Sequence, residues 1–167
     1  MTEEKDTNLF LKEVENKFKP DVKILDRFKY ILNNGTKEIL AKNILHIEKP
    51  WGNLYLLEDI NGVGISFLII HPKGSTSMHY HNNKQEFFMV KKGALTIEFE
   101  DQEKGVWTER QYDFFTPRKP HKMINNTEED IEVIEIIKPP NLDDLNRISD
   151  SYERKIGNVS IYDNEKV

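Results

Sequence analysis

Three histidines and one glutamate are the side chains whose types and spacing best suit chemistry. His79 and His81 are two positions apart, so on a β-strand both side chains lie on the same face. Glu86 follows a short polar stretch, and His121 follows a proline-rich turn later in the chain. Three imidazoles and one carboxylate leave one or two positions open on an octahedral ion. The pattern predicts one bound divalent metal ion, and zinc, manganese, iron, nickel and cobalt all suit it.

The composition excludes several other chemistries. The chain has no cysteine, so it forms no disulfide, thiolate zinc site or cysteine nucleophile. Its net charge of -5 gives no general basic surface, and we expect no nucleic-acid partner. The first residues are acidic and polar, unlike a signal peptide, and the longest apolar run, Phe67–Ile70, is too short for a bilayer. We therefore expect a cytoplasmic protein without a membrane partner.

The first part of the chain is predicted to be helical. Phe10, Val14 and Phe18 recur at helical spacing, and a second apolar stripe runs from Ile24 to Leu32. Two such helices cannot bury their apolar stripes on each other alone. We expect residues 1–45 to form a helical extension that packs on the following domain or on a second subunit.

Residues 46–140 are predicted to form a β-barrel or sandwich. The chain changes here to short strands punctuated by turns, such as 95–99, where apolar and polar residues alternate, and Ile131–Ile137, where five of seven residues are apolar. Many short, closely spaced strands are typical of such folds. Residues 141–167 form a polar tail that we expect to pack on the barrel, with a short helix at Leu142–Ile148.

Two segments resemble the two sequence motifs of the cupin superfamily. Residues 79–93 read His-x-His-x4-Glu-x6-Gly, and residues 117–125 read Pro-x-x-Pro-His-x3-Asn. A lone His-x-His pair is more often structural, whereas the two segments together are specific. The second differs from the motif in having Gln111 in place of its opening glycine and one residue fewer before the histidine; in the first, Gly74 lies one residue nearer to the histidines than usual.

The resemblance to cupins implies a fold and an assembly. The fold would be all-β, a single cupin barrel (a double-stranded β-helix, or jelly roll), here with an N-terminal α-helical extension. His79, His81, Glu86 and His121 would be the metal ligands. Cupins also resemble one another in burying an apolar strand face between subunits, which implies a homodimer.

Residues 49–154 resemble more closely the C-terminal cupin domain of type II mannose-6-phosphate isomerases, which carry a mannose-1-phosphate guanylyltransferase domain as well. The likeness lies in the opening Pro50-Trp51-Gly52, in the metal segment 77–86 and in the closing segment 143–154. The chain differs in having Lys84 where the family has arginine and Phe87-Phe88 where it has His-Trp.

This resemblance implies a sugar-phosphate isomerase that interconverts an aldose and a ketose, with a phosphorylated sugar as its small-molecule substrate. The metal ion would stabilise the enediolate, and a nearby base would move the proton between carbons. Lys84 and Tyr80 are the candidate catalytic residues by position in the sequence. Lys84, Arg118, Lys119 and Arg147 are the candidate substrate-binding residues, since lysine and arginine bind phosphate.

Other interpretations stay open. The loop cations are alternatively solvated surface charges, and Arg147 and Arg154 alternatively anchor the tail by pairing with Asp143, Asp144 or Asp150. The same four metal ligands would also serve an iron-dependent oxygenase or a lyase. A third hypothesis is a non-catalytic module that binds a metal or a sugar and assembles with a partner in polysaccharide synthesis.

Overall fold

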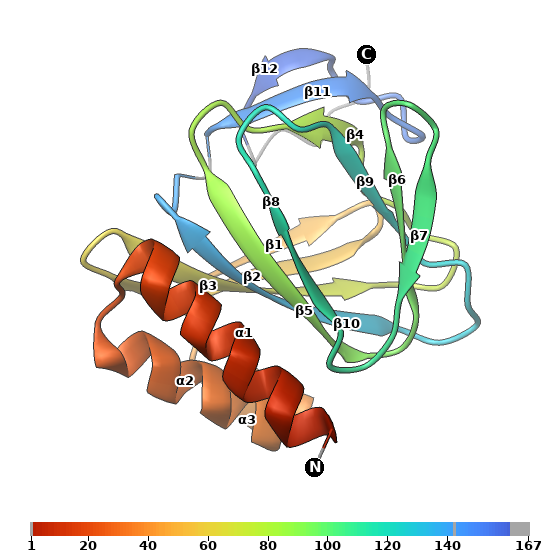
Figure 1. The fold of residues 1–167 in the computed structure, drawn as a ribbon. Coiled ribbons are helices and arrows are strands. Elements are labelled where there is room, and N and C mark those ends of the chain that lie inside the picture. The colour runs from red at the N-terminus through yellow and green to blue at the C-terminus, as the bar shows by residue number, and fades with distance from the viewer. Residues whose placement is uncertain (1, 142, 161–167) are drawn as a thin grey trace.

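Two six-stranded sheets face each other, and helices cover the outer face of one of them (Figure 1). The structure is a computed structural model that describes residues 2–141 and 143–160. The helices are α1 (Thr2–Phe18), α2 (Val22–Asn33) and α3 (Thr36–Leu40). The first sheet contains β1 (Leu45–Lys49), β2 (Gly52–Ile60), β3 (Val63–Ile70), β10 (Ile131–Lys138), β5 (Gln85–Lys92) and β8 (Tyr112–Phe115), in that spatial order. The second contains β12 (Gly157–Val159), β11 (Leu145–Ser149), β4 (Met78–Tyr80), β9 (His121–Ile124), β6 (Leu95–Phe99) and β7 (Lys104–Trp107).

The paired strands are antiparallel throughout both sheets. The strand order within each sheet departs from the order along the chain, as in a jelly roll. This confirms the predicted all-β barrel with an N-terminal helical extension. Among the described residues, no helix combines the length and the apolar character needed to cross a bilayer.

The central strands of the first sheet bury both of their faces. On β10, Val133 packs in the core between the sheets, whereas Ile134 and Ile136 pack in the core beneath the helices. Likewise on β5, Phe88 packs between the sheets and Phe87 under the helices. Burial on both faces explains why Ile131–Ile137 carries apolar residues at adjacent positions and not in strict alternation, because neither side of this strand faces water.

The helices dock on the barrel of their own chain. The Phe10 ring of α1 lies 4.8 Å from that of Phe28 on α2, 5.8 Å from Phe87 on β5 and 5.0 Å from Tyr112 on β8, between ring centroids. The helices were expected to pack on the barrel or on a second subunit, and they pack on the barrel. The helices cover one apolar face of the first sheet, and the expected homodimer stays a prediction.

The polar tail extends the second sheet. The sequence predicted a short helix at Leu142–Ile148, and this is wrong for the described part, since Leu145–Ser149 is strand β11, paired with β4 and β12. Leu142 lies outside the described residues. The physical reason is tertiary: β4 presents an edge to be paired, and alternation buries Leu145 and Arg147 on the barrel side.

Candidate metal centre

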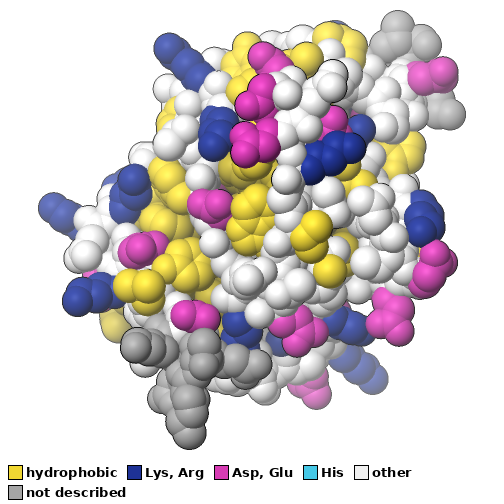
Figure 2. Space-filling model, turned by 45° about the vertical axis from the view of Figure 1, so that its right-hand side comes forward, with side chains coloured by type: hydrophobic (Ala, Val, Ile, Leu, Met, Phe, Trp, Pro, Cys, Tyr) yellow, Lys and Arg dark blue, Asp and Glu magenta, His cyan; other side chains and the backbone are white. Residues whose placement is uncertain are grey.

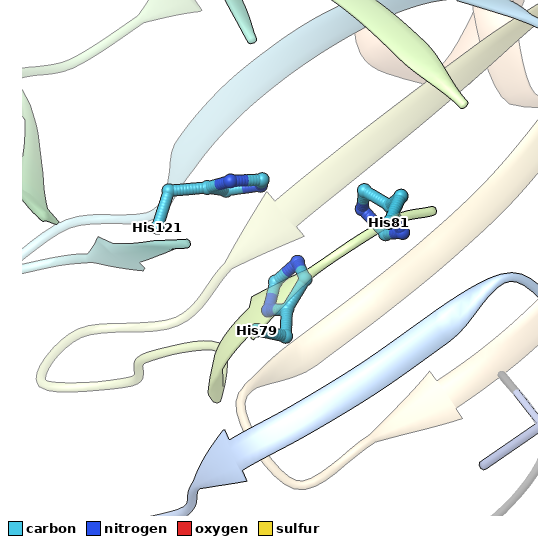
Figure 3. Close-up of side chains that lie close together, drawn as sticks. All are labelled: His79, His81 and His121. Carbon is cyan, nitrogen blue, oxygen red and sulfur yellow. The ribbon is translucent and has the colours of Figure 1, made fainter. Parts of the chain in front are cut away.

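The three predicted histidines converge between the two sheets. His79 lies on β4, His81 directly follows that strand, and His121 begins β9 opposite His79 in the register. One ligand nitrogen from each ring can be chosen so that all three lie within 4.8 Å of one another. Figure 3 shows the three rings directed toward a common space. Glu86 reaches the same place from β5 in the other sheet, with Oε1 2.5 Å from Nε2 of His81.

Backbone carbonyls fix the orientation of each ring. Nδ1 of His79 lies 2.7 Å from the carbonyl oxygen of Ser77, and Nδ1 of His121 lies 2.8 Å from that of Lys119. Nδ1 of His81 lies 2.5 Å from the carbonyl oxygen of Asp144. A carbonyl only accepts, so each Nδ1 is the protonated donor and each Nε2 keeps a free lone pair. This is the arrangement in which metal-ligating imidazoles are held.

Burial favours the neutral form of two of these imidazoles, those of His79 and His121. It lowers the pKa of His79 well below its usual range, and the neighbouring His121 and His81 lower it further. Burial likewise lowers the pKa of His121 to about 4. For Glu86, burial opposes ionisation, yet the neighbouring His81 and Lys84 hold its pKa well below the usual value. Neutral imidazoles and an ionised carboxylate are the forms that bind metal ions.

The donor set fits a divalent cation. Among the described residues, Oε1 of Glu86 is a buried oxygen without a hydrogen-bond partner, although it lies beside His81. Leaving such an atom unsatisfied costs about 1–3 kcal/mol, and more for a charged group. A cation between Glu86 and the imidazoles would remove that cost. Nitrogen and oxygen donors without sulfur suit zinc, iron, manganese, nickel and cobalt, and they do not choose among them.

A second buried glutamate lies behind the centre. Glu135 on β10 forms a hydrogen bond with Glu86 and accepts one from Oγ of Ser66 at 2.8 Å. Burial, together with the charge of Glu86, raises the pKa of Glu135 well above its usual range, which favours the protonated carboxyl group. Sequence reasoning missed this residue. The signal was the alternation on β10, because Glu135 is two positions from Val133 and shares its inward face.

The centre opens into a cavity with basic and apolar walls. Its volume, counted as space open to the centres of water molecules, is about 70 Å³, several times what one water needs. Four basic side chains line it, Lys49, Lys84, Arg147 and Arg154, against the carboxyl groups of Glu86 and Glu135. The apolar lining consists of Trp51, Leu54, Leu68, Met123, Ile137 and Leu145.

The candidate substrate residues separate into two groups. Lys84 and Arg147 line the cavity, and Nζ of Lys84 lies 3.8 Å from Oε1 of Glu86. Tyr80, Arg118 and Lys119 are not among the lining residues. Tyr80 neighbours His79 on β4, so strand alternation directs it away from the cavity. Arg118 and Lys119 are exposed, and Nζ of Lys119 lies 4.5 Å from the centroid of the Phe99 ring.

The tail closes over the cavity through a buried ion pair. Arg154 makes two side-chain hydrogen bonds with Asp150, each 2.9 Å long, and both side chains are almost fully buried. Of the anchoring pairs that the sequence suggested, this one forms. Arg147 donates to the carbonyl oxygen of Lys155 at 2.9 Å, and its charge contributes to lowering the pKa of Asp150.

One face of the exterior differs in charge from the cavity lining. On the face shown in Figure 2, basic and acidic side chains are interspersed, with apolar side chains between them. No continuous basic area covers this face.

Comparisons with known proteins identify the fold. Residues 66–137 match the family model described as a cupin domain. The capsular polysaccharide assembling protein CapF from Staphylococcus aureus aligns at a TM-score of 0.53 and 19% identity, over 64% of this chain and 32% of CapF. KdgF from Halomonas sp. aligns at 0.51 and 17%, over 56% of this chain and 83% of KdgF. A chain from the structures of the DMSP lyases RdDddP and RnDddQII aligns at 0.51 and 15%, over 58% and 52%.

These likenesses establish a single cupin domain and no particular activity. Identities below one fifth show a shared fold, and one fold hosts many functions. The chain spans about a third of CapF, so the activity of that whole protein is not carried over. A search of curated proteins finds no match. The resemblance to type II mannose-6-phosphate isomerases stays a prediction.

Proposed function

We propose that this chain, whose fold is that of a single cupin domain, is a metal-dependent isomerase of a phosphorylated sugar. The observation that carries the proposal is the placement of the His79, His81 and His121 triad and Glu86 in a cavity with four basic side chains. A substrate there would meet a cation at one end and lysine or arginine around it. Those are the groups that bind a sugar oxygen and a phosphate, respectively.

A divalent ion held by these ligands would supply a Lewis acid for the carbonyl and neighbouring hydroxyl of an open-chain sugar. The residues of the chain perform the remaining tasks. Lys84, buried and next to Glu86, is placed to bind the anionic part of the substrate or to take part in proton transfer. Glu135 lines the same cavity, its raised pKa favours the protonated form, and it is the second candidate for proton transfer.

The lining of the cavity suits an anionic substrate. Four basic side chains and two carboxyl groups line it, and one of the four, Arg154, is paired with Asp150. A phosphate or carboxylate of a substrate would meet lysine and arginine side chains in this lining, and these are the side chains that bind such groups. We extend the proposal to sugar-nucleotide or polysaccharide metabolism, the context that CapF carries in its name.

The test is turnover by protein of known metal content. Purified protein is analysed for bound metal, loaded separately with zinc, manganese, iron, nickel or cobalt, and incubated with mannose 6-phosphate and with glucose 6-phosphate. Formation of fructose 6-phosphate that His121→Ala abolishes and the exposed His71→Ala retains supports the proposal. Lys84→Met is expected to keep the metal and lose turnover. Absence of turnover with every metal and both sugars refutes it.

A second candidate is a lyase or an iron-dependent oxygenase acting on a small, partly apolar acid. The apolar wall, which includes Trp51, Leu68 and Met123, favours it, because a sugar offers little apolar surface to such a wall. Oxygen consumption with iron, or formation of an unsaturated product without oxygen, would distinguish these reactions from isomerisation. A non-catalytic module would bind the anion and convert none of the substrates tested.

A further inference from the structure

Asp144, just before β11, holds the segment that joins two of the proposed metal ligands. Its carboxylate accepts three backbone N–H groups: from Asn82 at 2.7 Å, from Asn83 at 2.7 Å and from Lys84 at 2.9 Å. Its carbonyl oxygen accepts the Nδ1 proton of His81. A single residue, about 60 positions later in the chain, therefore contacts the whole turn after His81.

The turn that Asp144 holds determines the position of Glu86. It leads from His81 at the end of β4 to β5, and it crosses from the second sheet to the first. Polar loops of this kind have many conformations when nothing satisfies their N–H groups. Here the carboxylate of Asp144, a residue that is only 7% exposed, accepts hydrogen bonds from three consecutive N–H groups. Charge-assisted bonds of this type are about twice as strong as neutral ones.

The strand that follows Asp144 adds a second link. β11 lies beside β4 in the second sheet (Figure 1), and Arg147 pairs with His79 in the register. The C-terminal segment thus contacts the backbone of one histidine and the ring of another. Within residues 143–160, the described part of this segment, none is a metal ligand by the sequence motifs or by the geometry.

We propose that Asp144 is the positioning residue of the metal centre, so that the affinity of the barrel for its metal ion depends on the C-terminal segment. Its carbonyl holds the His81 ring with Nε2 toward the ion, and its carboxylate holds the turn that delivers Glu86. The proposal rests on the metal centre and not on isomerase activity. Removal of groups that orient metal ligands typically lowers metal affinity about 10- to 100-fold.

The first test measures metal binding in variants of the full chain. Zinc or cobalt affinity is determined by competition with a chelator for wild type, Asp144→Ala, Asp144→Asn and the exposed neighbour Asp143→Asn. We expect Asp144→Ala to bind one equivalent about 10- to 100-fold more weakly, with an altered visible spectrum of the cobalt form. Asp144→Asn keeps one oxygen acceptor, so its metal affinity is expected to lie between those of wild type and Asp144→Ala. The metal affinity of Asp143→Asn is expected to match that of wild type. A folded Asp144→Ala with wild-type affinity and spectrum overturns the proposal.

The second test needs no substitution. Amide hydrogen exchange of the metal-free wild type is followed at residues 82–84, and the tautomer of His81 is read from its ring nitrogen chemical shifts. We expect protected amides and a proton on Nδ1 before metal is added. Amides that exchange as in an open loop, or a His81 proton on Nε2, refute preorganisation even if Asp144→Ala does not fold. Neither readout involves turnover, so failure of the isomerase assay leaves this result independent.

Discussion

Replacement of Phe10 by alanine tests whether the helical extension is an integral part of the fold. Phe10 is 0% exposed and contacts aromatic rings of α2, β5 and β8. Truncation of a fully buried phenylalanine costs about 3–5 kcal/mol, from lost burial and from the cavity left behind. A site with three ring neighbours has little freedom to collapse, so we expect about 4 kcal/mol. That is a large share of the roughly 5–15 kcal/mol by which such domains are stable.

The assay is urea unfolding followed by far-UV circular dichroism and tryptophan fluorescence. Leu9→Ala is the matched control, because the neighbouring Leu9 is 50% exposed, and a substitution at such a site usually changes stability by less than about 0.5 kcal/mol. Metal content is expected to stay unchanged in Phe10→Ala, since the ring packs on the sheet face opposite to Glu86. A loss below about 1 kcal/mol, or coincidence with Leu9→Ala, would refute the docking of α1 on the barrel.

The remaining predictions concern the tail, a turn and the metal ion. Asp150→Ala removes one partner of a buried ion pair and is expected to cost about 3–5 kcal/mol at neutral pH, measured by urea unfolding. Although burial opposes ionisation, the hydrogen bonds from Arg154 depress the pKa of Asp150. The stabilisation by Asp150 is therefore present above its unfolded pKa of about 3.9 and is lost as the pH falls through the lower folded pKa. The difference in free energy of unfolding between wild type and Asp150→Ala should accordingly become smaller in acid, and a difference that does not change with pH would contradict this. Gly52→Ala is expected to cost about 3 kcal/mol or more, because a Cβ would lie 1.8 Å from the carbonyl oxygen of Ile69 and φ is +153°; Gly62→Ala, with nothing within 4 Å, should cost only about 1–2 kcal/mol of backbone strain. Metal at 100 times its dissociation constant should stabilise the wild type by about 2.7 kcal/mol, and substitution of a triad histidine by alanine should reduce this sharply in thermal melts.

Local sequence patterns predicted most of the elements. The apolar periods of 10–18 and 24–32 identified helices α1 and α2, and alternation at 95–99 identified β6. Such patterns are informative because one buried face dictates the spacing of apolar residues. The pattern failed at 145–149, where a strand forms at the edge offered by β4. Pairing with a distant strand leaves no periodic mark in so short a polar segment.

The same contrast holds for the candidate site. The spacing of His79 and His81 and the motif around His121 brought together the three rings that the structure places within ligand distance. Tyr80, Arg118 and Lys119 are as near to these histidines in sequence, yet none lines the cavity. Sequence proximity places a residue near a site but does not say which way its side chain points.

By itself, then, the sequence determined most of the elements, the fold and the grouping of the three histidines, because these depend on periodicity and on short fixed spacings. Only the tertiary structure decided that Glu135 lies behind Glu86, that Arg154 pairs with Asp150 beside the cavity, and that Asp144 holds the turn after His81. Each of these contacts depends on the register between paired strands or on how the chain closes the barrel. Register and closure follow from the packing of the whole barrel, which no local stretch of residues specifies.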